Sequence, residues 1–429
     1  MSGAIDRRDI LYVTHNGITD HIGQSQIAPY CLALAERGHR IHIVSAEKPG
    51  RDALTAKYRE LFDARGIGWS TVDYHNRPQV LAQLWDLVQM RLLADRVAGD
   101  ERPKLVHCRS YLPIEIGVAI KKKFGARLLI DFRHFFVEAG LQDSRYKFVY
   151  RAFKSREVGY FRAADHVVTL THQAAEILDR WYPSVAGLDR FTVIPCCADF
   201  DHFDMAKVDR GEVARRRAAL GFGADDTVLL YLGSIGPVYL LDEMMALFRE
   251  LRALRPTAKF LFVSNNGEDE VRRAADSAGV PADAIRFLNA SRDEVPLYLA
   301  IADMSVMFFR PDLSLAGCSP TKMAELFAAN IPIISNGGVG DLDQILAPDR
   351  NCSVTVDDFR PATLRAAVQQ LLDVDQASRA TIRANSGDFT LGAGVDKYDA
   401  IYRRLLGSEA TTGGIDGAGS HDQQVDGTS

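Results

Sequence analysis

The chain alternates short, uninterrupted apolar runs with longer amphipathic stretches, and this alternation most restricts its fold. In the first half these runs are rich in Val, Ile and Leu and show no polar–apolar alternation; they lie at 10–14, 41–45, 105–107, 127–131, 166–170 and 191–195. Such runs are typical of parallel strands that are buried on both faces. Residues 26–37 place Ile27, Cys31 and Leu34 on one helical face, and Gly38 follows as a helix-ending glycine. Repeated strand–helix–strand units predict a doubly wound parallel α/β layer.

The second half of the chain repeats this pattern with a different sequence. Its strand candidates lie at 228–232, 260–264, 285–288, 304–309 and 331–335, and residues 241–254 carry one apolar helical face. The chain has 429 residues, which is longer than a domain with a single hydrophobic core usually is, so we expect two domains. The predicted fold class is α/β, with two Rossmann-like parallel-sheet domains facing a cleft.

Composition along the chain places the expected domain limits. Residues 201–217 are charged and poor in strand-like runs, which indicates a boundary. The N-terminal domain then covers 1–202 and the C-terminal domain 203–389. We expect residues 390–406 to form a helix that packs back on the N-terminal domain. Residues 407–429 have almost no large apolar side chain, so we interpret them as a disordered tail.

Charge and cysteine content argue against several classes of function. The net charge of −5 and the pI of about 6.1 provide no basic field to hold nucleic acid. No stretch approaches the roughly 20 apolar residues of a membrane-spanning helix. The six cysteines include no C-x-x-C pair that would indicate a zinc or redox site. We expect a cytoplasmic protein, either soluble or peripheral to the inner face of the membrane.

The strongest local signal for a ligand site is Ser319-Pro320-Thr321-Lys322, followed by Glu325. Ser319 suits a helix N-cap, and Pro320 suits the first helical position. The free amides of a helix start attract phosphate, and Lys322 adds a positive charge there. The alternative is a capped surface helix that carries a Lys and a Glu. Elsewhere neither G-x-G-x-x-G nor G-x-x-x-x-G-K-[ST] occurs at a strand end, so we predict neither a dinucleotide fold nor a P-loop.

Several segments, in order, resemble glycosyltransferase family 4, whose members are retaining GT-B enzymes. Residues 319–334 are similar to the family's donor-site helix and its following "P-V-I" strand. Residues 105–110 resemble its "V-H-x-H-S" strand end, and 193–203 resemble "V-I-P-N-G-V-D-x-x-x-F". Further similarity lies at 12–30, 164–171 and 230–236, so the resemblance covers nearly the whole ordered chain.

This resemblance implies a nucleotide-sugar site, with Glu325 holding the donor ribose hydroxyls. His107 to Tyr111 and Asp131-Phe132-Arg133 look like a subgroup that carries "H-x-R-S-Y" and "D-x-R". The implied catalytic candidates are therefore Arg109, Arg133 and the nearby Glu138. The implied donor-binding candidates are Gly23, Gly233, Ser234, Gly236, Arg310, Ser319, Thr321, Lys322 and Glu325.

The sequence departs from the family at three donor positions. The family's donor helix usually shows E-x7-E; Glu325 matches the second glutamate, whereas Gly317 stands at the first. Ser234 and Tyr239 stand where the family has an Arg and a Lys that grip the diphosphate. We expect Arg310 and Lys322 to supply the missing positive charge.

The function implied by the resemblance is sugar transfer from a UDP- or GDP-sugar to a glycan or lipid-linked acceptor, in polysaccharide or glycoconjugate biosynthesis. We expect no metal or other cofactor, and we interpret Asp341-Leu342-Asp343 as an exposed turn. Two alternatives stay open: a non-catalytic partner in a polysaccharide-assembly complex, and a GT-B nucleotide-sugar epimerase. The sequence identifies neither the base, the sugar nor the acceptor.

A basic and aromatic segment runs from Arg145 to Arg162. It predicts either peripheral contact with an anionic membrane or an ordinary packed helix, and we favour the packed helix.

Overall fold

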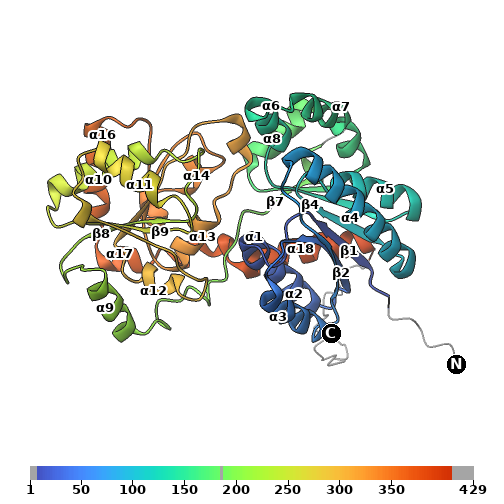
Figure 1. The fold of residues 1–429 in the computed structure, drawn as a ribbon, viewed down its shortest axis with the longest axis horizontal. Helices are drawn as coiled ribbons and strands as arrows, with labels where there is room; N and C mark the ends of the chain where they lie inside the picture. The colour runs from blue at the N-terminus through green and yellow to red at the C-terminus, as the bar shows by residue number, and fades with distance from the viewer. Residues whose placement is uncertain (1–6, 184–186, 408–429) are drawn as a thin grey trace, which may run out of the picture.

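The computed structural model describes residues 7–183 and 187–407, which form two α/β domains side by side (Figure 1). Most of the predicted tail, 408–429, lies outside the described residues. The N-terminal domain has a seven-stranded parallel sheet in the order β3-β2-β1-β4-β5-β6-β7. Its strands are β1 (Ile10–Thr14), β2 (Ile41–Glu47), β3 (Gly68–Asp73), β4 (Leu105–Arg109), β5 (Arg127–Phe132), β6 (His166–Thr169) and β7 (Phe191–Val193).

The C-terminal domain has a six-stranded parallel sheet in the order β10-β9-β8-β11-β12-β13. In both sheets the strand order reverses beside the first strand, and ligands of such sheets bind outside the carboxyl ends of the strands at this point. The strands are β8 (Val228–Leu232), β9 (Lys259–Val263), β10 (Ile285–Leu288), β11 (Met304–Met307), β12 (Ile333–Asn336) and β13 (Val354–Val356).

The predicted pair of doubly wound parallel sheets is confirmed, and every strand candidate is present within a few residues of its expected limits. Two strands were not predicted, β3 and β13. Both lie at the edge of their sheet and are only partly buried, so their residues do not form a continuous apolar run.

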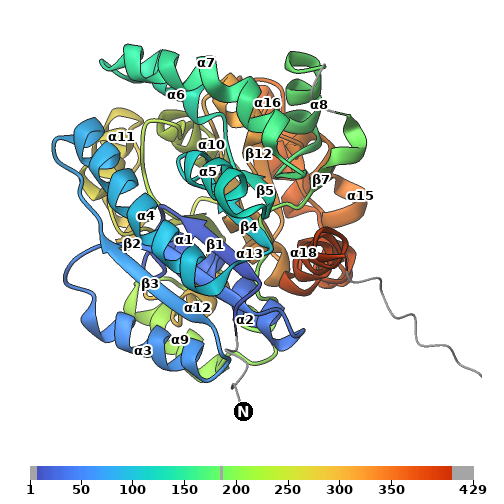
Figure 2. The same ribbon diagram turned by 90° about the vertical axis from the view of Figure 1, so that its right-hand side faces the viewer.

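Helices cover both faces of the N-terminal sheet (Figure 2). One face packs under α4 (Gln79–Glu101), α5 (Ile114–Phe124) and α7 (Lys147–Ala163), which share one core. The other face packs under α2 (Ala28–Glu36), α3 (Asp52–Asp63) and α18 (Leu391–Leu406). The shorter elements of this domain are α1 (His21–Gln26), α6 (Phe136–Asp143), α8 (His172–Trp181) and η1 (Leu188–Arg190).

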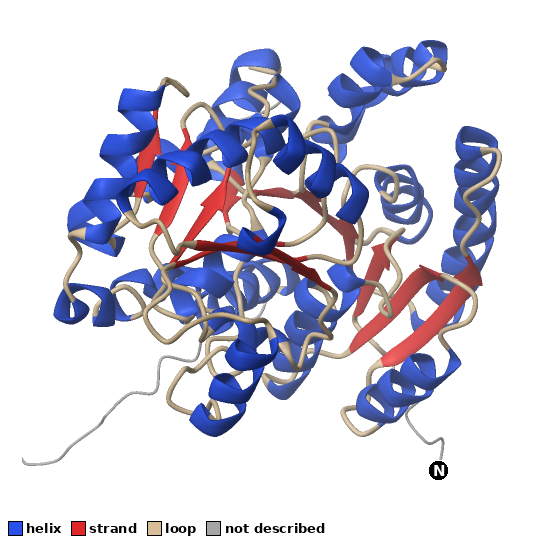
Figure 3. Ribbon diagram, turned by 60° about the vertical axis from the view of Figure 1, so that its left-hand side comes forward, coloured by secondary structure: helices blue, strands red, loops and turns tan. Residues whose placement is uncertain are grey.

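The C-terminal sheet is likewise covered on both sides (Figure 3). On one face lie α10 (Leu241–Leu254), which has the predicted limits, α11 (Glu268–Ser277) and α16 (Pro361–Leu372). On the other lie α9 (Arg210–Ala219), α12 (Val295–Leu299) and α13 (Thr321–Ala328). The remaining elements are α14 (Leu342–Ile345), α15 (Pro348–Asn351), α17 (Gln376–Ala380), η2 (Ala282–Ala284), η3 (Leu313–Gly317) and η4 (Ala384–Phe389).

The helix expected at 26–37 is present as α2, and a further short helix that was not predicted, α1, precedes it and meets it at Ile27. The backbone of Ile27 has φ −125° and ψ −63°, and a proline follows at the start of α2, so one continuous helix does not form. Gly23 lies inside α1, where an added Cβ would lie only 2.0 Å from the carbonyl oxygen of Gly17. Glycine at this position therefore allows the loop after β1 to fold tightly against α1.

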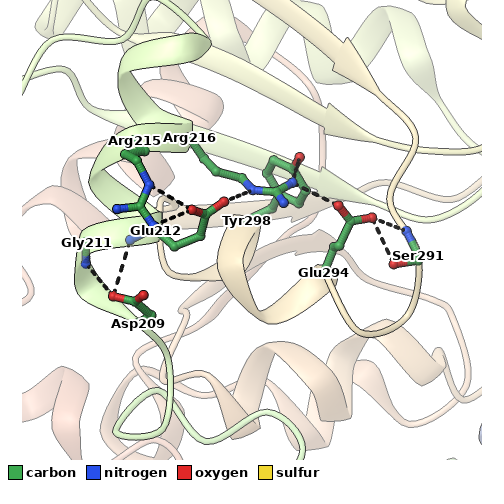
Figure 4. A network of polar contacts seen from close by, with 8 residues as sticks. All are labelled: Asp209, Gly211, Glu212, Arg215, Arg216, Ser291, Glu294 and Tyr298. Atoms are coloured by element: carbon green, nitrogen blue, oxygen red, sulfur yellow. Dashed lines mark hydrogen bonds and ion pairs between the residues drawn. The ribbon is translucent and has the colours of Figure 1, made fainter.

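Helix α9 begins the packed part of the C-terminal domain after the linker. Asp209 accepts hydrogen bonds from the amides of Gly211 and Glu212 and so caps the helix. Arg216 bonds Glu212 on its own helix at 2.7 Å and also reaches Glu294 and Tyr298 near α12 (Figure 4). This network holds the charged boundary segment on the C-terminal domain.

The chain crosses between the domains twice, at adjacent points. On the way out, Ala198 forms an isolated parallel bridge with Thr390 of the returning segment: its amide donates to Phe389 O at 3.0 Å, and Leu391 N donates to Ala198 O at 2.8 Å. The returning chain forms α18, whose Val395, Tyr398 and Tyr402 belong to a core of the N-terminal domain. Among the described residues, no helix has the length and apolar character needed to cross a bilayer.

Candidate functional site

A cavity of about 390 Å³ lies between the two domains, outside the carboxyl ends of the C-terminal strands. The N-terminal domain contributes residues from α1, and the C-terminal domain contributes the loops after β8, β9, β10 and β11 together with the start of α13. The lining includes His21, Ile22, Gln24, Ser25, Gly233, Ser234, Tyr239, Asn265, Asn289, Arg292, Thr321, Lys322 and Glu325. The predicted cleft is therefore present, and both domains form its walls.

Helix α13 begins one residue later than the sequence suggested. Pro320 is the N-cap, with φ −67° and ψ 121°, and Thr321 is the first helical residue. The expectation that Ser319 caps the helix is wrong, because its hydroxyl accepts a hydrogen bond from the amide of Cys196 at 3.1 Å. Pro320 and Thr321 line the cavity, so the first turn of α13, where helix amides lack partners within the helix, borders it.

Lys322 is buried in the wall of this cavity without a hydrogen-bond partner among the described residues. Its Nζ lies 4.2 Å from the ring centre of Tyr231 and 4.3 Å from that of Tyr239. Burial lowers the pKa of Lys322 to about 7, and the nearby Cys318 and Glu325 act in the opposite direction. A buried ammonium with unused donors is a strong attractor for an anion.

Gly233 lies directly beside this ammonium. Its φ is +111°, a conformation that favours glycine, and an added Cβ would lie 3.3 Å from Nζ of Lys322. Its amide donates to Val263 O at 3.0 Å, which fixes the loop after β8. A side chain at Gly233 would narrow the space that an anion needs.

Glu325 lies one turn after Lys322 on α13 and also lines the cavity. Its Oε1 is 3.9 Å from Nη1 of Arg292, which lines the cavity from the loop after β10. Burial raises the pKa of Glu325 to about 7, while Arg292 and Lys322 act to lower it. Sequence reasoning missed Arg292, although its place four residues after a predicted strand could have indicated it.

Residues 27–202 match the sequence profile of Glycosyltransferase Family 4, and residues 213–387 match that of Glycosyl transferases group 1. The chain belongs to the GT-B glycosyltransferases. None of the curated proteins matches its sequence.

Solved structures of low sequence identity share the fold of this glycosyltransferase. HepE from Anabaena, solved in complex with UDP-glucose, is 14% identical, with a TM-score of 0.65 over 92% of this chain and 99% of its own. WaaG, a glycosyltransferase involved in lipopolysaccharide biosynthesis, is 14% identical, with a TM-score of 0.64 over 94% and 100% of the two chains. The sucrose-phosphate synthase of Thermosynechococcus elongatus is 17% identical, with a TM-score of 0.66 over 94% and 100%.

The other predicted donor residues of this glycosyltransferase take different places. Gly233, Ser234 and Thr321 line the cavity with Lys322 and Glu325, whereas Gly23, Gly236, Arg310 and Ser319 are not among its lining residues. Gly23 lies in α1, from which His21, Ile22, Gln24 and Ser25 line the cavity. Arg310 is exposed after β11, and its backbone amide donates to Val238 O at 2.8 Å. Donor contact by these four residues stays a prediction.

Two of the predicted catalytic residues form a buried charge cluster around Asp131, at the end of β5. Nη1 of Arg109 lies 3.1 Å from one carboxylate oxygen of Asp131, and Nη1 of Arg133 lies 3.2 Å from the other. These guanidinium groups and His107 hold the pKa of Asp131 well below its usual range, against the effect of burial. None of these residues lines the donor cavity, and their catalytic role stays a prediction.

Glu138 lies in a different environment, on α6. Its Oε1 accepts a hydrogen bond from Lys154 Nζ at 2.7 Å, and Lys154 also bonds the buried Glu157 at 2.5 Å. The same ammonium lies 4.2 Å from the ring centre of Trp181. Glu138 is thus engaged with α7 and does not line the donor cavity.

The histidines that follow predicted strands have separate environments. His21 lines the cavity, and its Nε2 accepts a hydrogen bond from the Asn265 amide across the domains at 3.2 Å. His107 bonds the Tyr402 hydroxyl at 2.7 Å. His134 is exposed, and its ring lies 5.9 Å from that of Phe136. His15 lies 3.6 Å from the buried Asp86.

Asp341 is not part of an exposed turn, as we had expected. It is buried, and its carboxylate accepts hydrogen bonds from the amides of His172 and Gln173, at 2.6 and 3.0 Å, at the start of α8. A loop of the C-terminal domain therefore caps a helix of the N-terminal domain. The short β12–α14 loop brings this carboxylate inward, which the sequence spacing alone does not show. Within the described residues, no group of three or more His, Cys, Asp or Glu side chains could hold a metal ion.

Gly317, at the position of the family's first donor glutamate, also lies at the contact between domains. An added Cβ would lie 3.4 Å from the Cα of His134 and 3.5 Å from the ring of Phe135. The neighbouring Ala316 O accepts a hydrogen bond from the Thr171 hydroxyl at 2.7 Å. At the position where the family carries a glutamate, this chain therefore has a glycine that lies close to the backbone of the N-terminal domain.

Proposed function

We propose that this protein transfers a sugar, with retention of its anomeric configuration, from a UDP- or GDP-sugar to a glycan or lipid-linked acceptor in polysaccharide or glycoconjugate biosynthesis. The observation that supports it best is the unpaired, buried ammonium of Lys322 in the interdomain cavity. The chain's GT-B family and its likeness to HepE, solved with UDP-glucose, agree with a nucleotide sugar as ligand.

The donor diphosphate is proposed to bind between the loop after β8 and the start of α13. Lys322 supplies one formal positive charge, and the free amides of Thr321 and Lys322 supply donors at the positive end of the helix dipole. Tyr239 stands where the family has a cation, but its ring holds the Lys322 ammonium in place at 4.3 Å. In this proposal, Lys322 on α13 supplies the positive charge that the family carries at the position of Tyr239.

These groups would act on the departing nucleoside diphosphate. Charge builds on the diphosphate as the glycosidic bond breaks, and donors fixed in place before the reaction stabilise this charge more than mobile water does. Glu325 is proposed to bind the ribose hydroxyls, one turn away from the phosphates. The proposal includes no metal ion, so chelation of divalent cations should leave the rate unchanged.

Calorimetric titration of UDP and GDP tests the donor site. We expect the wild type to bind one of them and Lys322→Met to bind it on the order of 100-fold more weakly, as when one partner of a buried charge pair is removed. Lys57→Met, which changes an exposed lysine of α3, serves as the matched control and should bind normally. Equal affinity in the wild type and Lys322→Met would remove Lys322 from the site.

Product analysis tests the reaction itself. Incubation with nucleotide sugars, followed by NMR of the anomeric proton, should show transfer or slow hydrolysis with the configuration of the donor. An inverted product would contradict the retaining reaction. An epimerised nucleotide sugar would favour the epimerase, and tight binding without any turnover would favour the non-catalytic partner.

A further inference from the structure

Helix α4 lies on the outside of the N-terminal domain (Figure 2) and carries an exposed apolar stripe. Its opposite side packs into the domain core through Met90, Ala94 and Val97, so the helix is firmly attached. The exposed side carries large apolar residues at the i, i+3, i+4, i+7 and i+11 positions, each between 38% and 66% exposed: Leu81, Leu84, Trp85, Val88 and Leu92. Soluble helices normally turn polar residues to this side, so the stripe calls for a partner.

A second apolar residue group adjoins this stripe on α7. Leu84 of α4 lines a small cavity together with Val149 and Tyr150 of α7, so the two helices are neighbours. At the start of α7, Phe148 is 67% exposed, the highest value among the exposed large apolar side chains of the described residues. Further along this segment the aromatic residues Phe153, Tyr160 and Phe161 are buried, which confirms that α7 is a packed helix.

The charge around Phe148 is positive although the whole chain is acidic. Arg145, Lys147 and Arg151 are all exposed, and the one acidic residue of α7, Glu157, is buried. The chain as a whole has a net charge of −5. This surface therefore combines exposed, large apolar side chains with a local excess of positively charged residues.

We propose that the α4 stripe and the start of α7 form a docking surface for an anionic lipid bilayer. Helices that lie in the membrane interface bury one apolar face among the headgroups, and tryptophan is favoured at that depth. Basic residues beside the apolar face attract anionic lipid, at about 1 kcal/mol per residue. The stripe and the cations on this surface match both requirements.

The dimensions of the stripe argue against a second copy of the chain as its partner. From Leu81 to Leu92 the helix rises about 16 Å, and one helix is about 10 Å wide. The resulting area of about 160 Å² is far below the roughly 800 Å² per partner that a stable protein interface buries. Like-charged cations on two copies would also repel each other. A lipid surface needs neither a large area nor a complementary shape.

Flotation of the full-length protein with vesicles tests this proposal, which does not depend on the donor site. We expect binding to phosphatidylcholine vesicles that contain phosphatidylglycerol and little binding to phosphatidylcholine alone. The variant Leu81→Gln/Trp85→Gln/Leu92→Gln and the variant Lys147→Glu/Arg151→Glu should each lower the partition coefficient by on the order of tenfold or more. These side chains are exposed, so the fold and nucleotide binding should be unchanged.

Matched controls change similar exposed residues on the other domain. Leu313→Gln and Arg249→Glu/Arg255→Glu should bind vesicles like the wild type. Quenching by brominated lipid should affect the wild type but be reduced in Trp85→Phe, which keeps an aromatic ring on the stripe. Unchanged vesicle binding in both docking variants would overturn the proposal. So would concentration-dependent self-association of the wild type that the α4 variant abolishes, because the partner would then be a second copy.

Discussion

Replacement of Lys322 by methionine should stabilise the ligand-free protein while it removes donor binding. An ordinary lysine has a pKa of 10.5, and burial lowers that of Lys322 to about 7. At about 1.4 kcal/mol per pH unit, holding this lysine charged inside the protein costs about 5 kcal/mol. Methionine fills a similar volume without a charge, so the expected gain is a few kcal/mol, with about 5 kcal/mol as its upper limit.

The sign of the pH dependence follows from the lowered pKa. Between pH 7 and 10.5 the unfolded chain binds a proton at Lys322 that the folded protein does not bind, so wild-type stability rises with pH in this interval. The variant lacks this rise. Its advantage over the wild type should therefore be largest at or below pH 7 and should shrink by up to about 1.4 kcal/mol per pH unit above it.

Thermal unfolding monitored by calorimetry measures both effects. For a domain of 150–250 residues, each kcal/mol gained raises the melting temperature by about 2–4 °C. Lys57→Met controls for the general effect of losing a lysine. A variant that melts below the wild type at pH 7, or an advantage that does not change with pH, would show that Lys322 is not a desolvated ammonium. In that case Lys322 would not be the residue that attracts the donor diphosphate.

Four further outcomes are expected. Donor affinity should fall as pH rises above 7, because the anion binds the charged form of Lys322; calorimetry in buffers of different ionisation enthalpy should detect proton uptake, and its absence would contradict this. Glu325→Ala should weaken nucleotide binding about tenfold by loss of hydrogen bonds to the ribose, whereas unchanged affinity would place Glu325 outside the site. Arg109→Ala should lower stability by about 3 kcal/mol, because buried Asp131 loses one of its two arginines, and should reduce turnover more than donor affinity; wild-type melting and turnover would contradict both roles. Asp341→Ala should cost about 1 kcal/mol in a melting experiment through loss of the interdomain cap, and an unchanged melting temperature would show that the cap is not needed.

Much of the fold could be predicted because its central strands are buried on both faces. Burial of this kind requires continuous apolar runs such as those of β1 and β8, and these are visible in the sequence. Strands β3 and β13 lie at sheet edges and are only partly buried, so they do not need a continuous apolar run. Their sequences therefore could not be recognised as strands in this way. The break at Ile27 depends on a tight local turn, which apolar periodicity does not report.

From residue spacing alone, the candidate site was predictable only on α13, whereas the lining residues Gly233 and Ser234 were predicted from the family resemblance. Thr321, Lys322 and Glu325 share one helix, and their spacing indicated a phosphate site. The burial of Lys322 depends on Tyr231 and Tyr239, which lie more than eighty positions earlier in the chain and meet it only in the folded domain. The inward position of Asp341 likewise depends on the contact between domains.

The position of α18 has a consequence for how the protein is made. Tyr398 and Tyr402 complete the core of the domain that is synthesised first, but they emerge from the ribosome after the whole second domain. Until then, one face of the first sheet lacks the part of its cover that α18 supplies, and His107 lacks its hydroxyl partner. Domains usually fold in the order of their synthesis. Here the earlier domain reaches its final packed state last, when the end of the chain returns to it.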